Sequence, residues 1–326
     1  MKRTLLALLL AEGLAGSAWA VEGNDPPMPA EEARPAAPAA PAAPARPAHP
    51  AVPPMAPLPP LPPMERHAGS STVATINVKS AITLRADTIS SDIEVVHGND
   101  KQVKAELIDA SGSGIQLVQS GDRVEVVFAS THSGWPHVPA GIDGKLRVEV
   151  PWGSCVELTS ASGDLAVRDI GGNVRLRTAS GDAKVRRAAN VEAQLVSGDV
   201  TIENVSGEVR LRTVSGNAVV TQSGAANKLE FGTTSGDLEW AGACNGSCRI
   251  EARTTSGDVR LQMPQSSSFD LRYLTHSGDL SDDLKMQTLE NSPSRSGAGS
   301  VHARYGKSEG IIEVQTFSGD LHIARR

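Results

Sequence analysis

Seven aspartates recur at a nearly constant spacing between residues 164 and 320, and each one ends a Ser-Gly-Asp triplet. Carboxylate oxygens are preferred ligands of Ca²⁺, so aspartates stacked along one edge of a fold could bind calcium. Asn217 replaces aspartate in the middle of the series, however, and the spacing lacks the nonapeptide pattern of calcium-binding β-rolls. A turn Asp or Asn can instead accept hydrogen bonds from backbone N–H groups. We therefore predict a structural corner without a cofactor, with Ca²⁺ on the aspartate series as the alternative.

The predicted corner also uses the glycine of each triplet, because glycine adopts positive φ angles at no steric cost. The residues expected to form the corners are Gly163, Asp164, Gly181, Asp182, Gly198, Asp199, Gly216, Asn217, Gly236, Asp237, Gly257, Asp258, Gly278, Asp279, Gly319 and Asp320.

The three cysteines offer a second kind of chemistry. Cys244 and Cys248 flank an Asn-Gly turn in "CNGSC", so they are candidates for a small disulfide loop or for free thiols. Half of a metal site is the alternative, but no second Cys pair or nearby His completes it. Cys155 is left over and is expected in the core as a small hydrophobe. His132 and His137 are expected to be exposed loop residues and not metal ligands.

The sequence predicts no enzyme. It contains no P-loop, dinucleotide fingerprint or nucleophile–base motif. Carbohydrate-cleaving β-helices gather carboxylates in one groove with aromatic platforms, whereas here the acids are spread out and Trp135, Trp152 and Trp240 share no position of the repeat. The formal charge of −6 and the lack of a basic block argue against nucleic acid or an anionic membrane as the main partner.

The triplets belong to a longer repeat. Their serines lie at 162, 180, 197, 215, 235, 256, 277 and 318, so the period is 17 to 21 residues until a final gap of 41. Apolar residues stand four and six positions before the serine and three and five after it. Alternation with a period of two is typical of β-strands, and the change of parity indicates that the triplet absorbs one residue. Each period is thus predicted to be a strand, a corner, a second strand and a return.

A charged position supports stacking of these periods. Five residues before each serine stand Glu157, Arg175, Glu192, Arg210, Glu230, Glu251, Arg272 and Glu313. Opposite charges face each other along much of this series if each period pairs in parallel with the next. We predict an all-β fold, a parallel β-helix, with a β-sandwich as the alternative. The last rung should then have an open edge, which Arg325 and Arg326 would protect from association.

The N-terminal residues predict export. Lys2 and Arg3 precede an apolar run, and "AWA" provides a cleavage site between Ala20 and Val21, so residues 1–20 are expected to be a signal peptide. Residues 21–66 are a Pro/Ala-rich, disordered linker, and residues 67–326 form the β-helix, with irregular rungs to about 150 and regular rungs over 151–326. No segment of the mature chain is long and apolar enough to span a membrane.

The repeated pattern of alternating apolar residues, Thr and Ser-Gly-Asp, which follows "VEVPWGSCVELTSASGD", resembles a bacterial adhesin-like family of unknown function over residues 72–326. The resemblance implies a single-stranded right-handed β-helix, like the head domains of some surface proteins, and transfers no catalytic or binding residue. The Pro/Ala segment, "NSPSRSGAGS" and "CNGSC" lie outside the family pattern.

We therefore expect an exported, non-catalytic structural or interaction protein, in the periplasm or on the surface of a bacterium. Its partner would be an unknown envelope protein or a glycan. The alternatives are a carbohydrate-active enzyme on the same scaffold and a periplasmic partner in an envelope-stress signalling circuit.

Overall fold

The computed structural model describes residues 72–108, 113–130, 144–224, 227–293, 299–307 and 309–326. All of them fall in the unit Met64–Arg326. These residues form strands and turns, and no helix that could cross a membrane occurs among them. The predicted signal peptide, its cleavage site at Ala20 and Val21, the Pro/Ala segment, His132, His137 and Trp135 lie outside the described residues.

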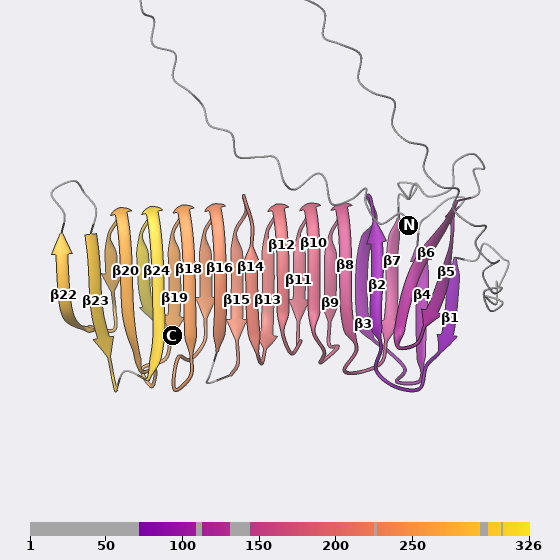
Figure 1. Cartoon of the computed structure of the whole chain (residues 1–326), viewed down its shortest axis with the longest axis horizontal. Coiled ribbons are helices and arrows are strands. Elements are labelled where there is room, and N and C mark those ends of the chain that lie inside the picture. Colours follow the sequence, from indigo (N-terminus) through magenta and orange to yellow (C-terminus); the bar gives the residue numbers. More distant parts are fainter. Residues whose placement is uncertain (1–71, 109–112, 131–143, 225–226, 294–298, 308) are drawn as a thin grey trace, which may run out of the picture. The chain divides into compact units, whose positions relative to one another are not determined.

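The described strands form two sheets (Figure 1). The order in sheet A is β22 (Gln287–Pro293), β23 (Gly299–Tyr305), β20 (Phe269–Ser277), β24 (Gly310–Ser318), β18 (Arg249–Ser256), β16 (Lys228–Ser235), β14 (Glu208–Arg212), β12 (Val191–Ser197), β10 (Val174–Ser180), β8 (Cys155–Ser162), β2 (Thr83–Thr88), β6 (Arg123–Ser130) and β5 (Ser113–Ser120). The order in sheet B is β1 (Val73–Asn77), β4 (Gln102–Ile108), β7 (Lys145–Val150), β3 (Asp92–His97), β9 (Leu165–Arg168), β11 (Ala183–Arg186), β13 (Val200–Val205), β15 (Ala218–Gln222), β17 (Leu238–Ala241), β19 (Val259–Met263), β25 (Leu321–Arg325) and β21 (Leu280–Asp282).

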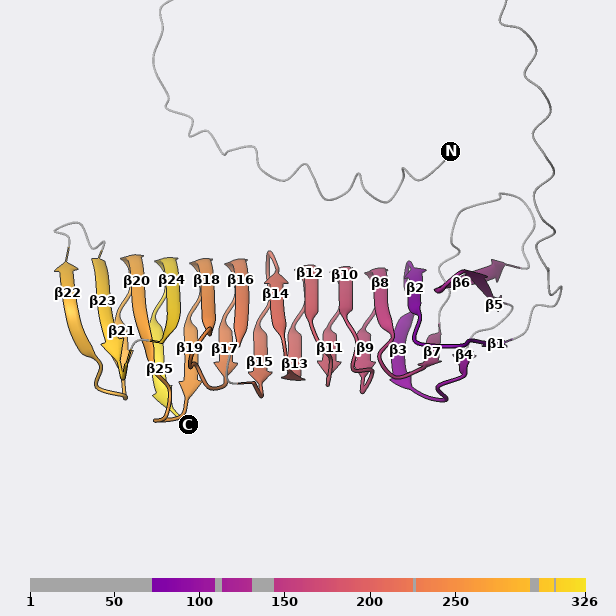
Figure 2. The same cartoon turned by 60° about the horizontal axis from the view of Figure 1, so that its bottom comes forward.

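A rung of the fold consists of one strand from sheet A, a Ser-Gly-Asp corner and one strand from sheet B (Figure 2). The rungs pair in parallel and in register, so that Ser180 is opposite Ser162 on one side and Ser197 on the other. This pairing confirms the all-β parallel solenoid and excludes a sandwich of antiparallel strands for the repeat.

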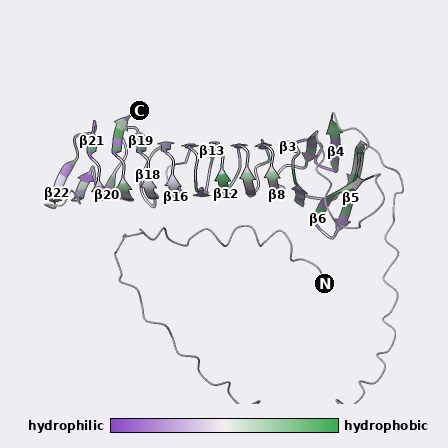
Figure 3. Ribbon diagram, turned by 90° about the horizontal axis from the view of Figure 1, so that it is seen from above, coloured by the Kyte–Doolittle hydropathy of each residue, from purple (hydrophilic) through white to green (hydrophobic). Residues whose placement is uncertain are grey.

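The core lies between the two sheets and is built from the alternating positions of the repeat. In β10 the side chains of Val174 and Leu176 are buried, and after the corner those of Ala183 and Val185 in β11 are buried too. The residues between them are exposed, so hydrophobic and hydrophilic residues intersperse along the strands (Figure 3). Small and β-branched side chains suffice here because the two layers are continuous from rung to rung.

The C-terminal rung lies inside the stack and not at its end, so the prediction of an open edge was wrong. Strand β24 pairs with β18 on one side and with β20 on the other, and β25 pairs with β19 and β21. Arg325 is opposite Met263. The rung of β20 and β21 therefore lies beyond the C-terminal rung, toward the end of the stack. Strand β23 pairs antiparallel with β20, and β22 pairs antiparallel with β23. Because every rung has the same inward pattern, the repeat does not specify which rung is whose neighbour.

The N-terminal region also departs from a simple succession of rungs. The rung of β2 and β3 pairs directly with β8 and β9, although some 60 residues separate them in the chain. Strands β6 and β7 continue the parallel stack beyond β2 and β3, whereas β5, β4 and β1 pair antiparallel at its end. The irregular rungs predicted up to about residue 150 therefore correspond to β2, β3, β6 and β7, whereas β1, β4 and β5 are paired antiparallel.

Candidate functional site

The glycines of the triplets are held in close contact with the preceding rung. Their φ angles lie between 122° at Gly198 and 158° at Gly278. A Cβ atom on Gly198 would lie 2.1 Å from the carbonyl oxygen of Gly181, and a Cβ atom on Gly181 would lie 2.3 Å from that of Gly163. The same contact recurs along the whole series, so glycine is required both by its backbone angle and by the rung beneath it.

The aspartates of the triplets form a continuous hydrogen-bonded ladder. The Oδ1 atom of Asp164 accepts a hydrogen bond of 2.9 Å from the backbone N–H of Asp182, and Oδ1 of Asp182 accepts one of 3.0 Å from Asp199. Asn217 takes part in the same way, because its Oδ1 accepts from the N–H of Asp237 at 3.1 Å. The ladder follows the spatial order of the rungs and continues through Asp258, Asp320 and Asp279.

The first member of this ladder, Asp92, was missed in the sequence. Its Oδ1 accepts a hydrogen bond of 2.9 Å from the N–H of Asp164. The signal was available, since "SSD" at 90–92 differs from the triplet only by Ser91 in place of glycine. By contrast, the intact triplet at 120–122 closes the antiparallel hairpin of β5 and β6, where a Cβ atom on Gly121 would meet nothing. The triplet acts as a rung corner only within the repeat.

Within the described ranges, no group of three or more His, Cys, Asp or Glu side chains is placed to hold a metal ion. In every ladder carboxylate but that of Asp279, the last member, one oxygen already accepts a backbone N–H, which is the role of a turn residue. The geometry thus gives the aspartates of the ladder a structural role in the corner. Only the second oxygen of each carboxylate is left for the calcium alternative.

Buried hydroxyls support the corner from inside. Thr178 donates a hydrogen bond of 3.0 Å to the carbonyl oxygen of Ser180, and Thr213 donates to that of Ser215. In the inserted rung, Thr316 bonds to Thr275 at 2.9 Å and to the carbonyl oxygen of Gly319. Thr233 and Thr254 occupy the same position, but their buried hydroxyls have no hydrogen-bond partner, so these contacts account for threonine at only some of the corners.

The outer face of sheet A carries a ladder of ion pairs. Arg175 bonds to Glu192 at 2.9 Å and to Glu157 at 3.2 Å, on the two neighbouring rungs. The hydrogen bond from Arg175 lowers the pKa of the Glu192 carboxyl below its usual range, and Glu192 raises the pKa of Arg175. Each such exposed pair contributes only about 0–1 kcal/mol to stability, so its value lies in fixing side-chain positions.

A shallow hollow of about 460 Å³ lies along the starts of β8, β10, β12 and β14. It is lined by Arg175, Glu192 and Glu208, by the hydrogen-bonded pair Asn173 and Asn190, and by other residues of these strands. Cys155 also lines it and is a free, half-buried thiol, so the expectation that it points into the core was wrong. It stands an odd number of residues from the inward positions, which places it on the outer side of its strand.

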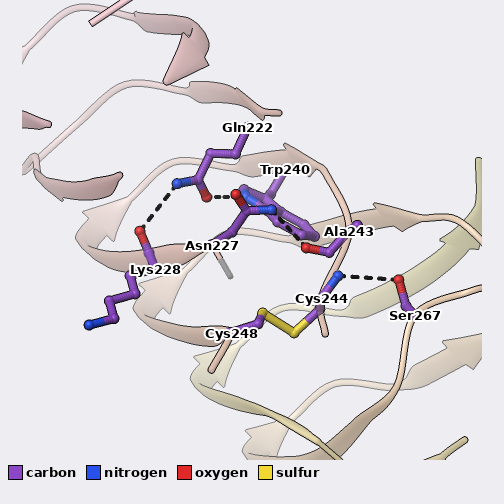
Figure 4. Close-up of a disulfide and its surroundings, with 8 residues drawn as sticks. All are labelled: Gln222, Asn227, Lys228, Trp240, Ala243, Cys244, Cys248 and Ser267. Carbon is purple, nitrogen blue, oxygen red and sulfur yellow. Dashed lines mark hydrogen bonds between the residues drawn. A yellow bond between two sulfur atoms is a disulfide. The ribbon is translucent and has the colours of Figure 1, made fainter. Parts of the chain in front are cut away.

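Cys244 and Cys248 form a disulfide in the return between β17 and β18 (Figure 4). The two side chains are buried, and the N–H of Cys244 bonds to the hydroxyl of Ser267. A Cβ atom on Gly310 would lie 2.7 Å from the sulfur of Cys244, so the disulfide packs on the start of the inserted strand β24. Nearby, Trp240 is buried and donates to Gln222 at 2.8 Å.

Two successive returns and the bulge at the end of β13 share a backbone feature that the sequence did not reveal. Asp169, Arg187 and Asn204 have φ angles of 59°, 53° and 56°. Asp and Asn adopt this left-handed conformation more readily than other residues, but arginine does so rarely. Arg187 bonds to Asp169 at 2.6 Å and thereby lowers the pKa of that carboxyl.

The chain belongs to the Toastrack DUF4097 family, whose model matches residues 80–324. No curated protein matches it. Two solved structures are similar: a "putative cell adhesion protein" from Clostridium sporogenes ATCC 15579 and a "putative adhesin" from Parabacteroides distasonis ATCC 8503. The first is 10% identical, with a TM-score of 0.25, and covers 78% of this chain and 99% of its own. The second is 9% identical, with a TM-score of 0.44, and covers 77% and 96%.

Proposed function

We propose that this chain is an exported, non-catalytic interaction module of the bacterial cell envelope, with a protein or a glycan as its partner. The observation that carries the proposal is the register-locked array of side chains on the outer face of sheet A. Each rung repeats the same positions about 4.8 Å from its neighbour, and ion pairs such as Arg175 with Glu157 and Glu192 hold the array in place. A rigid surface of this kind loses little conformational entropy when it binds.

Two further observations support export and a binding role. The Cys244–Cys248 disulfide suits an oxidising compartment outside the cytoplasm. The carboxylates in the hollow are neutralised by arginine, and the lowered pKa of Glu192 is the opposite of what a general acid in glycoside hydrolysis requires.

Co-sedimentation of the purified chain with isolated bacterial envelopes tests the proposal. Reversing the charges of Arg175 and Arg210 to Glu should weaken binding, whereas the same change at Lys184 and Arg260 on the outer face of sheet B should leave it intact. Protease treatment of the envelopes before mixing separates a protein partner from a glycan.

Equal sedimentation of all variants, or none by the parent chain, would contradict the proposal. New reducing or unsaturated ends after incubation with polysaccharides would favour the enzyme alternative instead.

A further inference from the structure

Trp152 is the only large aromatic side chain on the described returns that is more than half exposed, at 52%. It lies in the return from β7 to β8, opposite the Ser-Gly-Asp edge and apart from the outer face of sheet A. An aromatic side chain in a core typically buries about 150–250 Å² of surface. An indole that remains in solvent is therefore available to a ligand.

The structure holds this exposed ring in a fixed position. The backbone N–H of Trp152 donates to Oδ1 of Asp100 at 2.9 Å, and the N–H of the next residue, Gly153, donates to the carbonyl oxygen of Ile170 at 2.6 Å. The His97 ring is nearly perpendicular to the indole, at an interplanar angle of 83°, with ring centroids 5.7 Å apart. A side chain on Gly171 would collide with the indole, since its Cβ atom would lie 2.4 Å from the ring.

Polar groups stand beside the ring. His97 bonds to Oδ1 of Asp100 at 3.1 Å, while the Asp100 side chain as a whole is 70% exposed. The hydrogen bond from the Trp152 N–H, followed by that from His97, lowers the pKa of Asp100 and keeps its carboxylate ionised. A carboxylate with free acceptor capacity forms strong hydrogen bonds to ligand hydroxyls.

We propose that Trp152, together with His97 and Asp100, forms a subsite for one pyranose ring of a glycan. A pyranose has an apolar C–H face that can stack on the indole and a rim of hydroxyls that can donate to Asp100. A quaternary ammonium group would need a cage of several aromatic faces, and here a single imidazole stands perpendicular to the indole. The inference goes beyond the proposed function, because it adds a second, separate site in the return from β7 to β8 and names a glycan as its ligand.

The experiment follows the indole N–H resonances of the full mature chain by NMR during titration with cellotetraose, maltotetraose and the tetramer of N-acetylglucosamine. Tetramethylammonium chloride is the cation probe. The resonance of Trp152 is identified by its absence in Trp152→Phe. We expect at least one tetrasaccharide to shift it at concentrations up to about 10 mM, which exceeds the Kd of a weak 1 mM site.

The variants separate ligand contacts from folding. Trp152→Ala should weaken binding at least about tenfold, as truncation of an aromatic anchor does. Trp152→Phe should retain part of the affinity. Asp100→Asn keeps an acceptor for the Trp152 N–H and should weaken binding less than Trp152→Ala does. Phe317→Ala, which removes another exposed aromatic ring at 58% exposure, stacked on His276, should leave binding unchanged.

The inference is overturned if no tetrasaccharide shifts the Trp152 resonance, or if tetramethylammonium shifts it more strongly than the sugars do. It is also overturned if a folded Trp152→Ala chain binds envelopes and sugars as the parent does, a result that leaves the proposed function intact. Conversely, a sugar-dependent shift in a chain that does not sediment with envelopes would reject the proposed function alone.

Discussion

The two connections of each rung, the Ser-Gly-Asp corner and the return to the next rung, differ in how strongly their sequences are constrained. The Ser-Gly-Asp corner keeps its length and residue types because each glycine touches the carbonyl of the rung before it. Each Asp up to Asp320 also accepts the N–H of the rung after it. The returns vary, spanning 169–173, 187–190, 206–207, 223–227 and 242–248. A stacked corner is therefore constrained where backbone meets backbone, and it is free to vary elsewhere.

The returns also carry the features that occur only once in the molecule. The exposed Trp152, the left-handed Arg187 and the Cys244–Cys248 disulfide all lie on returns. The changes of period from 17 to 21 residues are absorbed there as well. The sequence is therefore constrained along the edge formed by the Ser-Gly-Asp corners, whereas residue types and lengths vary along the edge formed by the returns.

The largest loss of stability is expected for Gly198→Ala, which tests the contact between neighbouring corners. Its Cβ atom would lie 2.1 Å from a backbone oxygen that cannot move without displacing the neighbouring rung. We expect the free energy of unfolding in urea to fall by about 3 kcal/mol or more. Gly232→Ala is the matched control, because nothing lies within 4 Å of its Cβ position, and it should be near neutral.

Gly121→Ala separates backbone strain from steric collision. Gly121 has a positive φ of 66° but free space around its Cβ position. The variant should therefore be destabilised only by backbone strain, by about 1 kcal/mol. Equal costs at Gly198 and Gly121 would show that contact with the rung beneath is unimportant.

The second test removes the disulfide of the return. Its loop is short, so replacing Cys244 and Cys248 with Ala should lower the free energy of unfolding by about 2 kcal/mol in the chain-entropy model. Reduction of the parent chain should produce a similar loss, whereas the double variant should not respond to a reductant. A larger loss would indicate that the disulfide also holds the inserted strand β24 through Gly310.

The third test concerns the aspartate ladder. Asp199→Ala leaves the N–H of Asn217 without its acceptor and should cost about 1 kcal/mol, whereas Asp199→Asn should be milder, as the natural Asn217 indicates. Calcium should not change the melting temperature of the parent. A calcium-dependent rise that disappears in Asp199→Asn would restore the metal interpretation.

The smallest effect is expected at Asn204→Gly, at the bulge of β13 just before the return at 206–207. Glycine removes the strain at φ 56° but adds flexibility to the unfolded chain, so the two terms nearly cancel and stability should change by less than about 0.5 kcal/mol. The reverse exchange at the fixed corner, Gly198→Asn, should be as damaging as Gly198→Ala. If both exchanges were tolerated, the two corners would not differ as the structure indicates.

Much of a single rung could be predicted from the sequence. The alternation around Val174 and Val185 specifies which side chains face the core, and the change of parity at Gly181 specifies a corner. These features are local, so each rung carries its own evidence.

The order of the rungs could not be predicted, because identical inward patterns fit beside one another in any order. The charged position even favoured the wrong order, since Arg272 between Glu251 and Glu313 would alternate better. In the structure Glu251 is opposite Glu313, and Arg249 from the flanking position approaches both carboxylates. The Trp152 cluster was likewise invisible, because it joins His97 and Gly171 through the stacking of returns that differ in length.

The inserted position of β24 and β25 sets an order of events in time. Strand β20 precedes β24 in the chain, yet its parallel neighbour in the finished sheet is β24 and not β18. Strands β20 to β23 must therefore remain unattached to the stack, or attach to it in a provisional register, until β24 and β25 are in place. We expect the regular rungs up to β19 to gain amide-exchange protection first and β20 to β25 to gain it together, in a late step whose rate is set by the arrival of the last strands.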